Sequence, residues 1–180
     1  MKFAFVLAAA SLMAVGPLLA QTQVTSSASQ QVSPQDTKWL TYAAHDNQGE
    51  IQLCLLAEKR AHSLAVRAFA RLMVDDHVQV ESQLAAIDPN NATLLPNGPG
   101  QDAQKTLDKL LPLQGDAFDR EFMQAQIKDH GEDLKKYADE LNSTQDSSVR
   151  RYAALTRPIL EQHLALAKAV QAQLNSGSGS

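Results

Sequence analysis

The stretch Val66–Ile87 decides the fold of this chain, and it reads VRAFARLMVDDHVQVESQLAAI. Its apolar side chains recur at steps of three and four residues, which is the pattern of a helix with one apolar face. The face consists of Val66, Phe69, Ala70, Met73, Val80, Leu84 and Ile87. His77 falls in the same rhythm between Met73 and Val80, so we expect its imidazole to point into the core. A buried imidazole needs a polar or metal partner.

The composition favours a single all-α domain. The chain has 180 residues, of which 44% are hydrophobic, so a packed core is feasible. Aromatic residues make up only 5%, and alanine, leucine and glutamine are abundant, which favours helices over strands. The formal net charge is -4 and no basic block is present, which argues against a nucleic-acid partner. The single cysteine, Cys54, excludes an internal disulfide.

Residues 1–20 are predicted to be a secretory signal peptide. Lys2 precedes an apolar run from Phe3 to Ala14, and Ala20 is a small residue at a plausible cleavage point. The run is shorter than the roughly 20 apolar residues that a membrane-spanning helix needs. We therefore expect an exported, periplasmic protein without a transmembrane segment in its mature chain. Association with the outer membrane, a homo-oligomer and an envelope partner all remain open.

The rest of the chain is predicted to form an antiparallel four-helix bundle between flexible ends. Residues 21–33 and 176–180 are rich in small polar residues, which is typical of a flexible lead-in and a flexible tail. The bundle is expected to span residues 34–175, with long helices at about 34–60, 64–87, 116–141 and 147–174. Short connections join the first and the last pair, and a long crossing with a short helix at about 102–111 joins the two pairs.

Three histidines on three of these helices are expected to meet in the core. His77, His130 and His163 each lie near the middle of an apolar face. Counted from the turns that join the helices, their heights agree within roughly 7 Å at 1.5 Å per residue. The opposing positions on the first helix are Asp46, Asn47 and Glu50, with Glu50 on the edge of the face that carries Cys54 and Leu55.

This arrangement predicts a transition-metal site with His77, His130, His163 and Glu50 as ligands. Imidazole nitrogens together with one carboxylate suit zinc, copper, nickel or iron, and helical bundles are common hosts for such sites.

Four acidic residues are predicted to support the metal site. Asp76 and Asp129 each precede a histidine and lie about 100° around the helix from it, so each could hold the imidazole of a neighbouring helix. Glu81 and Asp133 each follow a histidine by about one turn, so either could supply an oxygen ligand.

Two alternatives to metal binding by a non-catalytic protein remain open. Buried histidines bonded to aspartates or carbonyls are common without a metal, which would fit a structural or interaction module of the cell envelope. A ferritin-like metal oxidase is the second alternative. The Glu-x-x-His motif of di-iron bundles is absent, because Val74, Ile127 and Leu160 stand three residues before the histidines. No nucleophile triad or glycine-rich phosphate loop is present, so no catalytic or cofactor-binding residue is assigned.

Four short motifs together carry a family resemblance. They are Phe69-Ala70-x-x-Met73-Val-x-Asp76-His77, Phe118-Asp119-Arg-x-Phe122, Asp129-His130 and Pro158-x-Leu160-x-x-His163. With them, residues 38–174 resemble an exported bacterial family catalogued as domain of unknown function four-one-four-two, also labelled predicted outer membrane protein. The resemblance implies a ferritin-like bundle and no established activity. The positions that match the family pattern are Glu50, Asp76, His77, Asp129, His130 and His163.

Overall fold

Local sequence signals set the ends of the first helix, α1 (Pro34–Arg60). The Ser33 hydroxyl caps it by accepting a hydrogen bond of 3.1 Å from the backbone N–H of Asp36, and Pro34 occupies the first turn, where a missing N–H costs nothing. Lys59 and Arg60 lie in the last turn, where positive charge is favourable. The computed structural model describes residues 32–87 and 98–177 of the chain.

Four further helices follow, and all regular structure in the described residues is helical. Their bounds are Leu64–Ala85 for α2, Gln101–Leu110 for α3, Gly115–Ser143 for α4 and Ser147–Gly177 for α5. The all-α prediction is confirmed, and the predicted boundaries agree within about three residues. The predicted signal peptide, most of the lead-in, residues 88–97 of the crossing and the last three residues lie outside the described residues.

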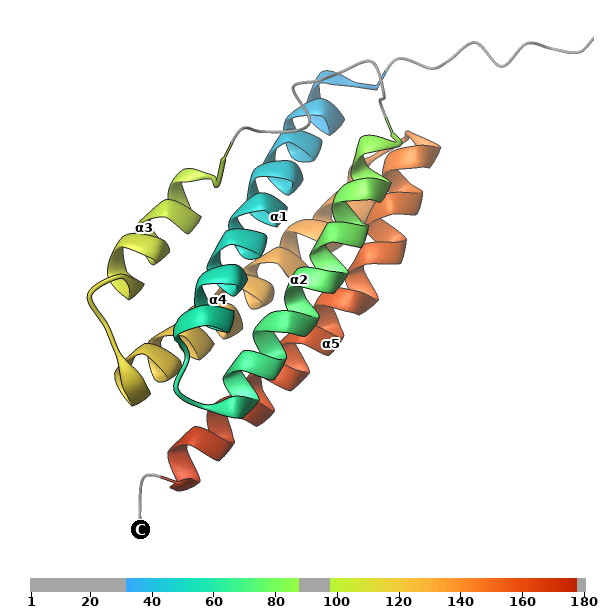
Figure 1. Ribbon diagram of the computed structural model, residues 1–180. Coiled ribbons are helices and arrows are strands. Elements are labelled where there is room, and N and C mark those ends of the chain that lie inside the picture. Colours follow the sequence, from blue (N-terminus) through green and yellow to red (C-terminus); the bar gives the residue numbers. More distant parts are fainter. Residues whose placement is uncertain (1–31, 88–97, 178–180) are drawn as a thin grey trace, which may run out of the picture. The chain divides into compact units, whose positions relative to one another are not determined.

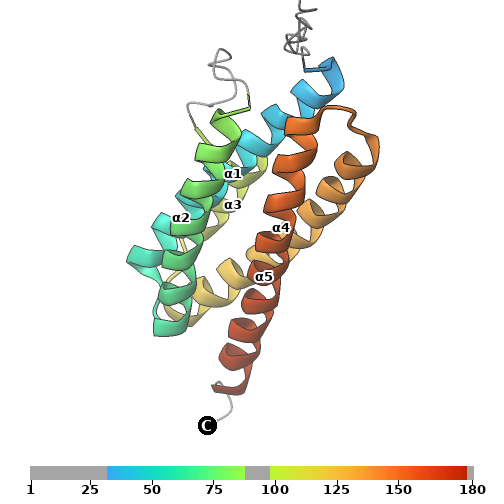
Figure 2. The same ribbon diagram turned by 90° about the vertical axis from the view of Figure 1, so that its right-hand side faces the viewer.

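The long helices pack as two sequential pairs. Helix α1 lies against α2 and α4 lies against α5, while contacts of α2 with α5 and of α1 with α4 join the pairs (Figures 1 and 2). The short helix α3 lies against α1 and α4. Gly49 permits this close approach, because a Cβ atom at that position would lie 2.4 Å from the Cβ of Ala103. No helix within the described part of the chain is long and apolar enough to cross a bilayer.

The core contains two apolar clusters with a polar layer between them. One cluster includes Phe69, Phe118 and Phe122, and the other includes Leu84 and Tyr137. The buried polar side chains that separate the clusters along α1, α2, α4 and α5 are Asn47, Glu50, His77, Gln126, His130, Asp133 and His163. The candidate site therefore occupies the middle of the core.

The predicted inward face of α1 is buried at Asn47 and Cys54, but the prediction was wrong at Leu55. Leu55 is 39% exposed instead of inward, and Leu53 and Ala57 fill the core at this height. Glu50, predicted on the edge of the face, is only 1% exposed. Glu50 is buried because α1 packs against α3 and α4 as well as α2, so a broader part of its surface is covered than a single apolar stripe suggests.

Candidate metal centre

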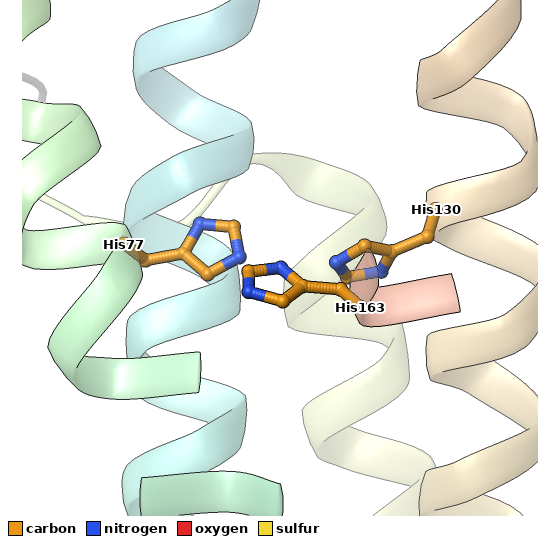
Figure 3. Close-up of side chains that lie close together, drawn as sticks. All are labelled: His77, His130 and His163. Carbon is orange, nitrogen blue, oxygen red and sulfur yellow. The ribbon is translucent and has the colours of Figure 1, made fainter. Parts of the chain in front are cut away.

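Three imidazole rings meet in the polar layer, one each from α2, α4 and α5 (Figure 3). The ring centroid of His163 lies 5.3 Å from that of His77 and 5.4 Å from that of His130. The centroids of His77 and His130 are 5.9 Å apart. One nitrogen of each ring lies within 4.8 Å of a nitrogen of the other two. The side chains are 1–3% exposed. The predicted meeting of these histidines at one depth is therefore present in the structure.

The tautomer of His77 is set by Asn47. The Asn47 Nδ2 amide donates a hydrogen bond of 3.0 Å to the backbone carbonyl of His77, which leaves Oδ1 of the same amide as an acceptor. This oxygen lies 2.8 Å from His77 Nδ1. The ring nitrogen Nδ1 must therefore carry the proton, and Nε2 keeps its lone pair.

The other two rings are held in the same manner by acceptors at their outer sides. His130 Nδ1 donates to the Gln126 carbonyl oxygen at 3.1 Å, so Nε2 is its lone-pair nitrogen. His163 Nε2 donates to Asp76 Oδ2 at 2.9 Å, so Nδ1 is its lone-pair nitrogen. The lone-pair nitrogens of all three histidines are buried and have no hydrogen-bond partner among the described residues.

Electrostatics keep the three rings neutral near pH 7. Burial and the neighbouring imidazoles lower the pKa of His77 well below its ordinary value. Burial, with a contribution from His163, lowers the pKa of His130 to about 3. Burial also lowers the pKa of His163, although the Asp76 carboxylate opposes this shift. Neutral imidazole is the form that binds metal ions.

The arrangement has the chemistry of a metal centre whose ligands are oriented from outside. Metal-bound histidines usually donate the second ring N–H to a carboxylate, a backbone carbonyl or water, which fixes the tautomer. Asp76 and the Gln126 carbonyl are acceptors of the first two kinds, and the side-chain amide oxygen of Asn47 accepts from the third ring. The three inner nitrogens could hold zinc, copper, nickel or iron.

Glu50 does not join the histidines. Its Oε2 accepts a hydrogen bond of 2.7 Å from Gln126 Nε2 and lies 3.9 Å from the Cys54 sulfur. The position of α1 that faces the histidines is Asn47, one turn earlier, and Glu50 faces α4 instead. The structure thus separates the predicted carboxylate ligand from the predicted imidazole ligands.

A second titratable group lies between α1 and α4. Carboxylate oxygens of Asp46, Asp129 and Asp133 lie within 4.8 Å of one another. The Tyr42 hydroxyl donates to Asp133 Oδ1 at 2.5 Å and lies 3.3 Å from an oxygen of Asp46. Lys136 Nζ donates to the Tyr42 hydroxyl oxygen at 2.5 Å. This group was not predicted as a site of its own.

Of the four acidic residues predicted to support the metal site, only one contacts a histidine side chain in the described residues. Asp76 holds the imidazole of the neighbouring helix α5, as the sequence predicted. Asp129 lies with Asp46 and Asp133 and makes no hydrogen bond to a histidine within the described ranges. Asp133 is bonded to Tyr42 and not directed at the imidazoles. Glu81 accepts a hydrogen bond from the Gln48 side chain, because it faces α1.

Sequence reasoning missed the outer partners of His77 and His130. The periodicity of α1 predicts that Asn47 points inward, but it predicts no partner for its amide group. Gln126 acts on His130 through a backbone carbonyl, which every residue possesses, so no residue-type signal could have identified it.

Fold and site together define the class of protein: an all-helical chain with a group of three histidines in the middle of its core. Residues 21–170 match the family model described as Domain of unknown function (DUF4142), so the chain belongs to this family. Neither a curated protein nor a solved structure matches the chain.

Proposed function

We propose that this chain is a periplasmic, ferritin-like four-helix bundle that binds one transition-metal ion through His77, His130 and His163. Zinc, copper, nickel and iron all suit three imidazole ligands. The protein would act as a metal-binding or metal-buffering component of the bacterial envelope, without a catalytic residue of its own. The resemblance of residues 1–20 to a signal peptide supports export. The packing of α1 with α2 and of α4 with α5 supports the bundle.

The observation that carries the proposal is the direction of the three N–H groups. Each ring donates its only proton outward, to Asn47, Gln126 or Asp76, so none can donate to another ring. Three buried lone pairs are left facing one another without a donor. Leaving a buried acceptor unsatisfied costs about 1–3 kcal/mol. One metal ion would satisfy all three.

The same observation disfavours a metal-free histidine network. Such a network stabilises a core when its N–H groups and lone pairs are matched to each other. Here the outer N–H of each ring has a hydrogen-bond acceptor, but the inner lone pair has no donor among the described residues. The inner nitrogens are therefore better explained as ligands than as structural hydrogen-bonding groups.

Metal analysis of the untagged protein tests the proposal. We expect one equivalent of bound metal in the wild type after exposure to zinc, none in the His77→Ala variant, and one equivalent in a His62→Ala control. The His62 residue is exposed, so this control removes an imidazole from outside the site. Equal metal content in the wild type and the His77→Ala variant would contradict the proposal, as would a wild type that binds no transition metal.

A further inference from the structure

A cavity of about 940 Å³ lies beside the polar layer, between α1, α3 and α4. Asp46 and Glu50 line it from α1, and Asp129 lines it from α4. Asp46 and Glu50 are one helical turn apart, as are Asp129 and Asp133, so the two pairs face each other across the α1–α4 contact. These four residues, Asp46, Glu50, Asp129 and Asp133, are called the carboxylate group, and they lie between α1 and α4.

An independent feature shows that this group is more than a set of solvated acids. Glu50 is 1% exposed, and its Oε1 has no hydrogen-bond partner in residues 32–87 and 98–177. Burial raises the pKa of Glu50 well above its ordinary value, and the neighbouring carboxylates Asp129 and Asp46 raise it further. An acceptor buried beside other acceptors needs a cation or a proton.

The protein supplies too little positive charge for this group. Among the described residues, Lys136 is the cation that pairs with it, at 3.6 Å from Asp133. The other lysines that line the cavity pair with acids outside the group: Lys105 with Asp102, Lys109 with Glu121 and Lys128 with Glu132. Four carboxyl groups are thus left with one ammonium group.

We propose that Asp46, Glu50, Asp129 and Asp133 bind a hard divalent cation of the Mn²⁺, Ca²⁺ or Mg²⁺ class, at a site separate from the three histidines. Carboxylate oxygens are the ligands that these cations prefer, whereas imidazole selects the later transition metals. The cavity leaves room for water molecules to complete the coordination shell. The site does not depend on metal binding by the histidines.

The alternative is that the carboxyl groups share protons and bind no cation. When carboxyl groups lie close together, one of them commonly keeps its proton, which removes the repulsion between two negative charges. The two possibilities differ in an observable manner, because a proton-sharing group shows no saturable binding of a hard cation at pH 7.5.

Titration of the untagged protein with Mn²⁺ alone, followed by electron paramagnetic resonance, tests the proposal. We expect one equivalent of bound Mn²⁺ in the wild type and in the His77→Ala variant. The double variant Asp46→Asn, Asp129→Asn should bind at least about 100-fold more weakly, since two ligands are lost. Glu50→Gln tests the same site with a single near-isosteric change and should also weaken binding. Circular dichroism confirms that each variant is folded.

Glu132→Gln is the matched control, because Glu132 lines the same cavity but pairs with Lys128. It should bind Mn²⁺ as the wild type does. A wild type without saturable Mn²⁺ binding would overturn the proposal, as would equal affinity in the wild type and in both the double variant and Glu50→Gln. If the wild type binds no Mn²⁺ but His77→Ala loses its zinc as expected, only the carboxylate site is refuted. If the wild type binds Mn²⁺ as expected but binds no zinc, only the histidine site is refuted.

Discussion

Glu50 and Asp133 of the carboxylate group belong to the same polar layer as the three histidines, but the two groups are built in opposite ways. In the histidine group every N–H is bonded outward and every inner nitrogen is neutral and unpaired. In the carboxylate group the buried unpaired atom is an oxygen, Oε1 of Glu50, and the group borders a cavity. Both contain more acceptors than donors. The difference teaches that one core can hold two kinds of electron-pair donor, neutral imidazole nitrogens and carboxyl oxygens, which under our two proposals would bind two kinds of cation.

The largest effect should come from removing one histidine. We expect His163→Ala to lower zinc affinity by more than about 100-fold, since loss of a direct ligand exceeds the 10–100-fold effect of losing an outer partner. Competition with a chromophoric zinc chelator measures this. The Asp46→Asn, Asp129→Asn variant should keep wild-type zinc affinity, and an equal loss in both variants would show that the two groups form one site.

Loss of an outer partner should have a smaller effect. The Asp76 carboxylate orients the His163 ring and makes it more basic. Asp76→Asn removes this charge, so zinc affinity should fall about 10–100-fold. The neighbouring Asp75 is exposed, and Asp75→Asn is the matched control. The same competition assay applies, and unchanged affinity in Asp76→Asn would show that this contact does not tune the histidine group.

Two glycine substitutions test how closely α3 packs against α1 beside the carboxylate group. Gly49→Ala places a methyl group against Ala103 and should destabilise the protein by about 1–3 kcal/mol while weakening Mn²⁺ binding. Gly131→Ala meets nothing within 4 Å and should stabilise α4 by roughly 0.5–1 kcal/mol. Urea unfolding measures both values. Destabilisation of similar size in both variants would contradict the close packing of α3.

The pH dependence of the metal-free protein should reveal the two groups with opposite signs. The pKa of His130 is lowered to about 3, so the unfolded chain binds its proton first and stability falls as the pH drops from about 6.5 towards 3. The pKa of Asp133 is raised to about 6, mainly by burial and then by Asp129. Its favourable contribution is present below about 4 and is lost as the pH rises through 6.

Urea unfolding between pH 4 and 6.5 separates these contributions. His130→Gln should flatten the rise of stability with pH, and Asp133→Asn should steepen it. A change in the same direction for both variants would mean that the two groups do not differ as described.

The meeting of the three histidines could be predicted because it depends on periodicity and chain length alone. His77, His130 and His163 share the rhythm of buried residues, and rise per residue fixes their heights. The contact of Asp76 with His163 also followed from its place beside the apolar face.

The assignment of Glu50 could not be made from the sequence. Each residue along a helix changes the direction of a side chain by about 100° and its height by 1.5 Å, so a small uncertainty in the rotation of α1 decides whether Asn47 or Glu50 faces the histidines. The packing of α3 through Gly49 fixes that rotation, and it depends on contacts distant in sequence.

The direct test of the central claim is X-ray absorption spectroscopy at the zinc edge of the untagged, zinc-loaded protein. The account predicts a first shell that contains three imidazole nitrogens at about 2.0–2.1 Å, and no such zinc signal in a His77→Ala sample that is loaded and washed in the same way. A spectrum without imidazole scattering, or one that is identical in the wild type and His77→Ala, would contradict it.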